Sequence, residues 1–78
     1  MEEQIYVIIN KIIGIPLDKI TKELSPDNVE VWDSLLHMEL LVSLEEEFGI
    51  EFSDEQIAKS MSVGEIIDII VDLMNLNK

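Results

Sequence analysis

The segment Glu30–Ile50, "EVWDSLLHMELLVSLEEEFGI", predicts the central helix of this protein. Asp33 is a preferred N-cap residue, because its carboxylate can accept a hydrogen bond from a free N–H group of the first turn, and Gly49 suits the left-handed conformation that ends many helices. Between them, apolar residues recur every three or four positions, as on a buried helix face. They are Leu36, Leu40, Leu41, Leu44 and Phe48. We therefore predict a helix over residues 34–48.

A second apolar strip on this helix consists of Leu35, Met38 and Val42. These side chains could extend the core, but the first strip already supplies a core-facing side. A small exposed apolar strip with acidic residues around it is typical of a docking surface, and methionine adapts to differently shaped partners. We therefore interpret this strip as a place where partner proteins bind.

The residues before this segment predict one helix and one long loop. Residues 2–13, "EEQIYVIINKII", carry isoleucines at helical spacing. Gly14 followed by Pro16 is a helix stop signal. Residues 15–33 show no sustained period, so we expect a loop there with one helical turn around residues 17–22. A loop of this length inside a small domain is often functional.

The residues after it predict a short helix over 53–59 and a longer one over 62–75. Ser53 with Gln56, and Ser62 with Glu65, match the capping-box pattern at the two helix starts. The inner face of the last helix is predicted to consist of Val63, Ile66, Ile67, Ile70, Val71 and Met74. No alternating pattern indicates a sheet. The sequence therefore predicts an all-α fold with three main helices and one short helix.

The charge of the chain limits its partners. Its 78 residues include 17 acidic residues and five lysines, which gives a net charge of −12. Phosphate backbones are bound by lysine and arginine, so we expect no nucleic-acid partner. The acids favour encounter with basic patches on partner proteins. The chain length fits one small domain without a deep active-site cleft.

Cysteine is absent, which excludes disulfides, thiolate metal sites and a cysteine nucleophile. No apolar run approaches the roughly 20 residues that a membrane helix needs, and the first residues lack a cleavable signal pattern. We expect a cytoplasmic protein without stable membrane insertion.

Ser34 stands at the start of the central helix and has two readings. It could simply be the first helical residue, or it could be a modification site, because a phosphate there would meet unpaired N–H groups at the positive helix end. Ser34 and His37 share a helix face, but a hydrolase also needs an oriented histidine and an oxyanion hole. We therefore do not favour catalysis and expect His37 to be a surface or edge residue.

The acidic residues predict no specific metal site. The segment "SPDNVEVWD" offers Asp27, Asn28, Glu30 and Asp33, but it lacks the glycine of a calcium-binding loop. The neighbouring carboxylates Glu45 and Glu46 are expected to belong to a solvated face.

The motifs around Ser34 resemble the acyl carrier protein family. The segment "DSLLHMELLVSLEEEFGIEFSDEQI" is similar to the family from the D-S-L motif through the short third helix, and "SVGEIIDII" resembles its fourth helix. The resemblance covers essentially the whole chain. It implies a four-helix bundle forming a single carrier domain over residues 1–78, without catalytic activity. It also implies 4′-phosphopantetheine attached to Ser34, with Asp33 in a supporting role, and an acyl or aminoacyl thioester on the arm.

The resemblance further implies how partners are recognised. The matching positions of the recognition helix are Leu35, Met38, Glu39, Val42 and Glu46. The expected partners are a phosphopantetheinyl transferase and acyl-loading and acyl-transferring enzymes with basic patches. The carrier itself is expected to be a monomer. The alternative is an acidic helical interaction module that has lost the arm.

Trp32 separates this chain from carriers of primary fatty-acid synthesis, which commonly read G-A-D-S-L. The W-D-S-L form resembles stand-alone carriers in dedicated fatty-acid-like, polyketide, peptide or polysaccharide pathways. Trp32 could anchor the loop on the bundle, as a lone tryptophan often does. It could instead help an enzyme to distinguish this carrier from a housekeeping one.

Overall fold

Helix α2, Ser34–Phe48, lies at the centre of the fold and has the predicted bounds. The Asp33 carboxylate accepts a hydrogen bond from the Leu36 N–H at 2.9 Å, so the predicted N-cap is confirmed. Gly49 ends the helix at φ 64°, a left-handed conformation that glycine adopts without steric cost. The start and the end of α2 are therefore both set by residues at its boundaries.

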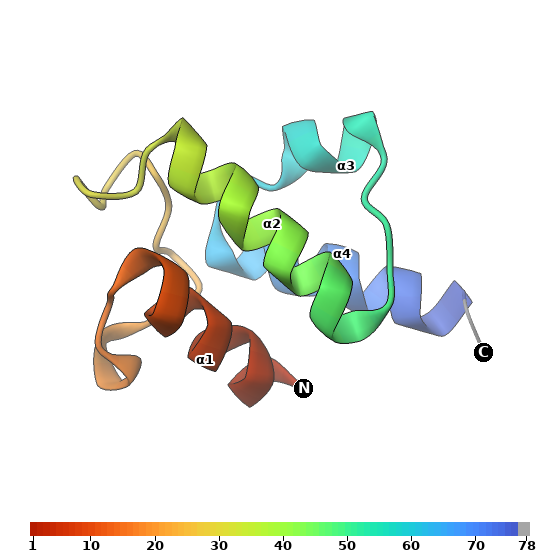
Figure 1. The fold of residues 1–78 in the computed structure, drawn as a ribbon, viewed down its shortest axis with the longest axis horizontal. Coiled ribbons are helices and arrows are strands. Elements are labelled where there is room, and N and C mark those ends of the chain that lie inside the picture. The colour runs from red at the N-terminus through yellow and green to blue at the C-terminus, as the bar shows by residue number, and fades with distance from the viewer. Residues whose placement is uncertain (77–78) are drawn as a thin grey trace.

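The computed structural model describes residues 1–76, and the regular elements of this part are all helical (Figure 1). Besides α2, the α-helices are α1 (Glu2–Ile13), α3 (Asp54–Lys59) and α4 (Val63–Leu76). A short 3₁₀ turn, η1 (Leu17–Lys19), lies in the long loop. The predicted all-α class with three main helices and one short helix is confirmed. The first and last residues of α1, α2, α3 and α4 each lie within one residue of the predicted position. Residues 77 and 78 of the predicted domain lie outside the described residues.

One hydrophobic core joins the three long helices and the connecting segments. In Figure 1, α1 lies beside α2, and α4 passes behind α2. The helices contribute the buried residues Ile5, Ile9, Ile13, Leu40, Leu41, Leu44, Val63, Ile66, Ile67 and Ile70. The connecting segments add Ile20, Trp32, Ile50 and Phe52. The predicted core residues Leu36, Phe48, Val71 and Met74 are only half-buried at its edge.

The start of α4 holds the long loop in place. The Val63 N–H donates to the Leu24 carbonyl at 2.9 Å, and the Gly64 N–H donates to the Lys22 carbonyl at 3.0 Å. The first N–H groups of a helix have no partner within the helix, so the loop carbonyls complete them. The loop therefore has a defined path although it contains only one short helical turn.

The two predicted capping boxes differ in the structure. At α3 the box is complete, because Gln56 N–H donates to Ser53 Oγ at 3.1 Å and Ser53 N–H donates to Gln56 Oε1 at 2.9 Å. At α4 the Glu65 N–H donates to Ser62 Oγ at 3.2 Å, but the Glu65 carboxylate accepts from the Ser62 hydroxyl at 3.3 Å. The second box is therefore half formed, since the carboxylate does not reach the backbone.

Glu45 is a correction to the sequence-based expectation of a solvated face. Its Oε2 accepts a hydrogen bond of 2.8 Å from the N–H of the buried Phe52. This N–H lies between α2 and α3, where the backbone has no ladder partner, and an unpaired buried N–H is costly. Glu45 thus ties the α2–α3 connection to α2, whereas Glu46 is exposed as expected.

We expect Glu45→Ala to destabilise the protein more than Glu46→Ala. The first change leaves the Phe52 N–H without its charged acceptor, which costs roughly 1.5–3 kcal/mol, while the second stays within about 0.5 kcal/mol. Both changes remove one negative charge, so the difference between them isolates the hydrogen bond. Urea unfolding of the two variants measures it, and equal midpoints would contradict this role of Glu45.

We also expect added salt to raise the melting temperature. Within residues 1–76 only two ion pairs form, Glu2–Lys22 at 3.4 Å and Glu55–Lys59 at 3.0 Å, and both are exposed. The remaining acids therefore repel one another in the folded state. Raising sodium chloride from about 0.01 M to about 0.1 M shortens the screening length from about 30 Å to about 10 Å. A melting temperature that stays constant over this range would show that repulsion does not limit stability.

Candidate functional site

The candidate site begins at Ser34, the first residue of α2, whose side chain is exposed. Asp33 fixes the first turn through its hydrogen bond to the Leu36 N–H. The N-terminus of α2 carries the positive end of the helix dipole. A hydroxyl in this position is accessible to a modifying enzyme, and a phosphate on it would be favoured electrostatically.

A pocket of about 270 Å³ opens beside Ser34. It lies where the long loop, α2 and the link between α3 and α4 meet. Its lining residues are Pro26, Ser34, His37, Met38, Ser60 and Met61. Met61 is half exposed, so the pocket is reached from solvent. A group attached to Ser34 therefore has a largely apolar surface next to it.

Three side chains, two of which line this pocket, form a hydrogen-bonded chain, which we name the Trp32–His37–Ser60 chain. Trp32 Nε1–H donates to His37 Nδ1 at 3.1 Å, and His37 Nε2 lies 3.1 Å from Ser60 Oγ. The Ser60 hydroxyl donates to the Ile57 carbonyl at 2.6 Å. An indole N–H can only donate, so Nδ1 carries no proton. The neutral ring is therefore protonated on Nε2, which donates to Ser60.

His37 lies at the edge of the core, as expected, but the hydrogen bonds at both of its ring nitrogens were not predicted. It is half-buried, and burial lowers the pKa of its imidazole, while hydrogen bonding to the backbone of Ser60 acts in the opposite and smaller sense. Trp32 and Ser60 occupy its two ring nitrogens, which leaves none to accept a proton from Ser34. The arrangement does not support a serine hydrolase, although both residues line the same pocket.

Trp32 is 2% exposed and is the largest of the fully buried side chains. Its predicted role as an anchor for the loop is confirmed by this burial and by its hydrogen bond to α2. The indole does not reach the surface, so it is not available for direct contact with an enzyme. No local sequence pattern indicates which residue accepts the hydrogen bond from its indole N–H.

The second apolar strip is exposed, as predicted. Leu35, Met38 and Val42 are 70%, 44% and 46% exposed. They line a groove of about 350 Å³ between α1 and α2, together with Ile12, Glu39 and Ser43. Ile12 is one of the isoleucines at helical spacing in the first helix, and its place in the second wall of this groove was not predicted.

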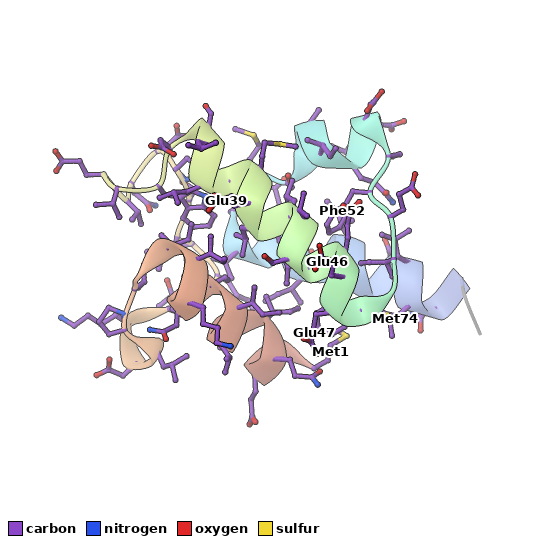
Figure 2. All side chains as sticks on the ribbon, viewed as in Figure 1. Met1, Glu39, Glu46, Glu47, Phe52 and Met74 are labelled. Atoms are coloured by element: carbon purple, nitrogen blue, oxygen red, sulfur yellow. The ribbon has the colours of Figure 1, made fainter. Side chains whose placement is uncertain are left out.

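The two acidic residues predicted for partner recognition, Glu39 and Glu46, both project from α2 (Figure 2). Glu39 borders the groove, and Glu46 lies beyond it, where it lines a neighbouring hollow with Lys11 and Ile12. Both carboxylates are exposed. The structure thus brings Glu39 together with the apolar strip and places Glu46 farther along the same helix.

The loop residues considered as possible metal ligands are Asp27, Asn28, Glu30 and Asp33. The side chains of two of them, Asn28 and Asp33, have structural roles. The Asn28 amide accepts from the Ser25 N–H at 3.0 Å and donates to the Glu23 carbonyl at 2.9 Å, and Asp33 caps α2. Within residues 1–76, no three His, Asp or Glu side chains gather in a way that could hold a metal ion. In the same part of the chain, every helix is too short or too polar to cross a bilayer.

Known proteins are similar to this chain in sequence and in fold. Residues 3–70 match the family model described as "Phosphopantetheine attachment site". An acyl carrier protein of Buchnera aphidicola subsp. Schizaphis graminum is 41% identical over 70 residues, which cover 90% of this chain and 89% of the relative. An acyl carrier protein of Acidothermus cellulolyticus is 36% identical over 66 residues, which cover 83% of this chain and 77% of the relative.

A solution NMR structure of holo acyl carrier protein from Geobacter metallireducens superposes with a TM-score of 0.86 at 28% identity. The superposition covers 97% of this chain and 87% of the other. The family match over residues 3–70 includes Ser34 and ends within α4, and the structural match extends over nearly the whole chain. The chain therefore belongs to the family of phosphopantetheine-binding acyl carrier proteins and is a carrier of acyl groups without catalytic activity.

Proposed function

We propose that Ser34 is the attachment residue for 4′-phosphopantetheine and that this carrier presents acyl or aminoacyl thioesters to the enzymes of a dedicated pathway. The observation that carries the proposal is the exposed Ser34 hydroxyl on the first residue of α2. The proposal also includes a single carrier domain over residues 1–78, a monomeric state and a cytoplasmic location.

The residues around Ser34 fit the phosphate of such an arm. The N-terminus of α2 favours an anion, and Ser34 is exposed, so solvent surrounds the point of attachment. Asp33 supports the site because its cap on Leu36 N–H fixes the turn that holds Ser34. When attached, the arm supplies a terminal thiol that carries the acyl group as a thioester.

The proposed docking surface combines apolar contact with negative charge. Leu35, Met38 and Val42 provide the apolar area, and Glu39 and Glu46 provide exposed carboxylates on the same helix. The sequence contains neither lysine nor arginine between Lys22 and Lys59, so no permanently charged cation of α2 offsets these acids. Such a surface attracts a partner with a basic patch and then seats it by apolar burial.

The dedicated pathway is supported by Trp32. A fully buried indole occupies the position where carriers of primary fatty-acid synthesis commonly have a small residue. Since the indole is buried, it influences partners through the loop and pocket that it holds. We therefore propose a fatty-acid-like, polyketide, peptide or polysaccharide pathway, with its own loading enzyme.

We expect a phosphopantetheinyl transferase and coenzyme A to add the mass of one phosphopantetheine group to the purified protein. Ser34→Ala should show no increase, because the acceptor hydroxyl is missing. Thr21→Ala, which removes another exposed side-chain hydroxyl, should be modified in full. Intact-mass spectrometry separates these outcomes. An unmodified wild-type chain would favour the arm-less interaction module.

We expect Glu39→Lys to slow the modification of Ser34 more than Asp68→Lys, which makes the same charge change at an exposed position of α4. A like-charge contact at the docking surface opposes complex formation, and a loss of about tenfold in kcat/KM corresponds to about 1.4 kcal/mol. We expect this loss in kcat/KM to come from a higher KM, with kcat nearly unchanged. Equal losses in the two variants would indicate a response to net charge and would remove α2 as the docking surface.

A further inference from the structure

The Trp32–His37–Ser60 chain joins the end of the long loop, the first turns of α2 and the C-terminal end of α3. We infer that His37 is a proton-operated latch: the neutral ring holds Trp32 in the core, and the charged ring releases it. This inference goes beyond the proposed function, because it requires neither an attached arm nor a partner protein. It rests on the donor and acceptor assignments along the chain.

The Trp32 side of the latch depends on an unprotonated nitrogen. The neutral ring accepts the indole N–H at Nδ1 over 3.1 Å. A protonated imidazole has an N–H on both nitrogens, so the indole N–H would then face another donor at this distance. The indole has no acceptor with which to adapt. Protonation therefore breaks the hydrogen bond between Trp32 and His37.

The Ser60 side of the latch does not depend on the charge. Ser60 is fully buried, and its hydroxyl proton is used toward the Ile57 carbonyl. Its oxygen accepts from Nε2–H in the neutral ring and can do the same in the charged ring. The proton thus separates His37 from the loop while leaving it bound to the end of α3. We expect the loop end around Trp32 to move, and α3 to stay in place.

The charged groups near His37 are engaged elsewhere. On α2, the Asp33 carboxylate accepts from the Leu36 N–H. On α3, Lys59 precedes Ser60 and pairs with Glu55 at 3.0 Å. The long loop meets the ring with the uncharged Trp32, and Met61 lines the pocket from the α3–α4 link. Within residues 1–76 no carboxylate hydrogen-bonds to the ring to stabilise its charged form.

The direction of the pH effect follows from burial. Burial lowers the pKa of His37 below its ordinary value, which is about 6.5 in an unfolded chain. The unfolded chain therefore binds the proton more readily than the folded one. The contribution of the latch to stability is complete above about pH 6.5 and declines as the pH falls toward the lowered pKa. Below that pKa the loss is complete and the latch is open.

The pocket beside Ser34 is the part of the molecule that the latch would reshape. Ser34, His37 and Ser60 all line it, and the hydrogen bond from Trp32 supports the His37 ring within this lining. Release of Trp32 removes that support while α2 stays capped by Asp33. A mildly acidic environment would therefore alter the surface next to the proposed attachment residue without unfolding the bundle.

Acrylamide quenching of tryptophan fluorescence tests the latch directly, because the chain contains one tryptophan and one histidine. We expect weak quenching of the wild type at about pH 7.5 and a several-fold increase on acidification to about pH 5, the range in which histidine titrates. Helix content, followed by far-ultraviolet circular dichroism, should stay constant. His37→Gln is the matched control, because its amide can accept from Trp32 and donate to Ser60 but does not titrate. Its quenching should not change with pH.

Trp32→Phe provides the second measurement. Phenylalanine removes the opposing N–H, so we expect the NMR titration of the His37 ring to move upward relative to wild type. Any one of four results would overturn the latch. They are a wild-type quenching constant that is flat with pH, a pH response that survives in His37→Gln, a loss of helix content in step with quenching, and a His37 titration that is unchanged in Trp32→Phe.

Discussion

The hydrogen bond from the Leu36 N–H to the Asp33 carboxylate fixes the start of α2. It pairs one of the free N–H groups of the first turn and leaves Ser34 as the first helical residue. Successive residues of an α-helix are rotated by about 100°, since 3.6 residues make one turn. This one helix therefore buries Leu40, Leu41 and Leu44 in the core and exposes Leu35, Met38 and Val42 on another side. The core, the candidate attachment residue and the proposed docking surface thus all depend on α2, whose first turn Asp33 holds.

The connecting segments are held by side chains and helix ends, because the described part of the chain has no sheet to pair them. The free N–H groups of α4 bind the loop carbonyls of Lys22 and Leu24. Glu45 binds the Phe52 N–H, and Trp32 fills the space between the loop and the helices. In a small domain with little core area, such contacts decide whether a long loop has one conformation. They also explain why buried residues occur outside the helices.

The features that could be predicted from the sequence are those that local patterns determine. The helices and their inner faces followed from 3–4 spacing, and their ends followed from Asp33, Gly49, Ser53 and Ser62, because these signals act within one turn. The Trp32–His37–Ser60 chain could not be predicted, since Ser60 lies 23 residues from His37 and no periodicity connects them. The roles of Glu45 and Ile12 were missed for the same reason. Each depends on which element packs against α2, and the sequence pattern contains no information on that arrangement.

The distribution of charge links stability to the proposed function. Lys11, Lys19 and Lys22 all precede the loop end, and α2 contains neither lysine nor arginine. Exposed ion pairs contribute little to stability, typically about 0–1 kcal/mol, so placing lysines on α2 would gain little for the fold. It would, however, neutralise Glu39 and Glu46 and cover the apolar strip with long side chains. The uncompensated acids on α2 are therefore consistent with a surface kept open for a basic partner, and partner binding would remove the repulsion that the folded chain otherwise retains.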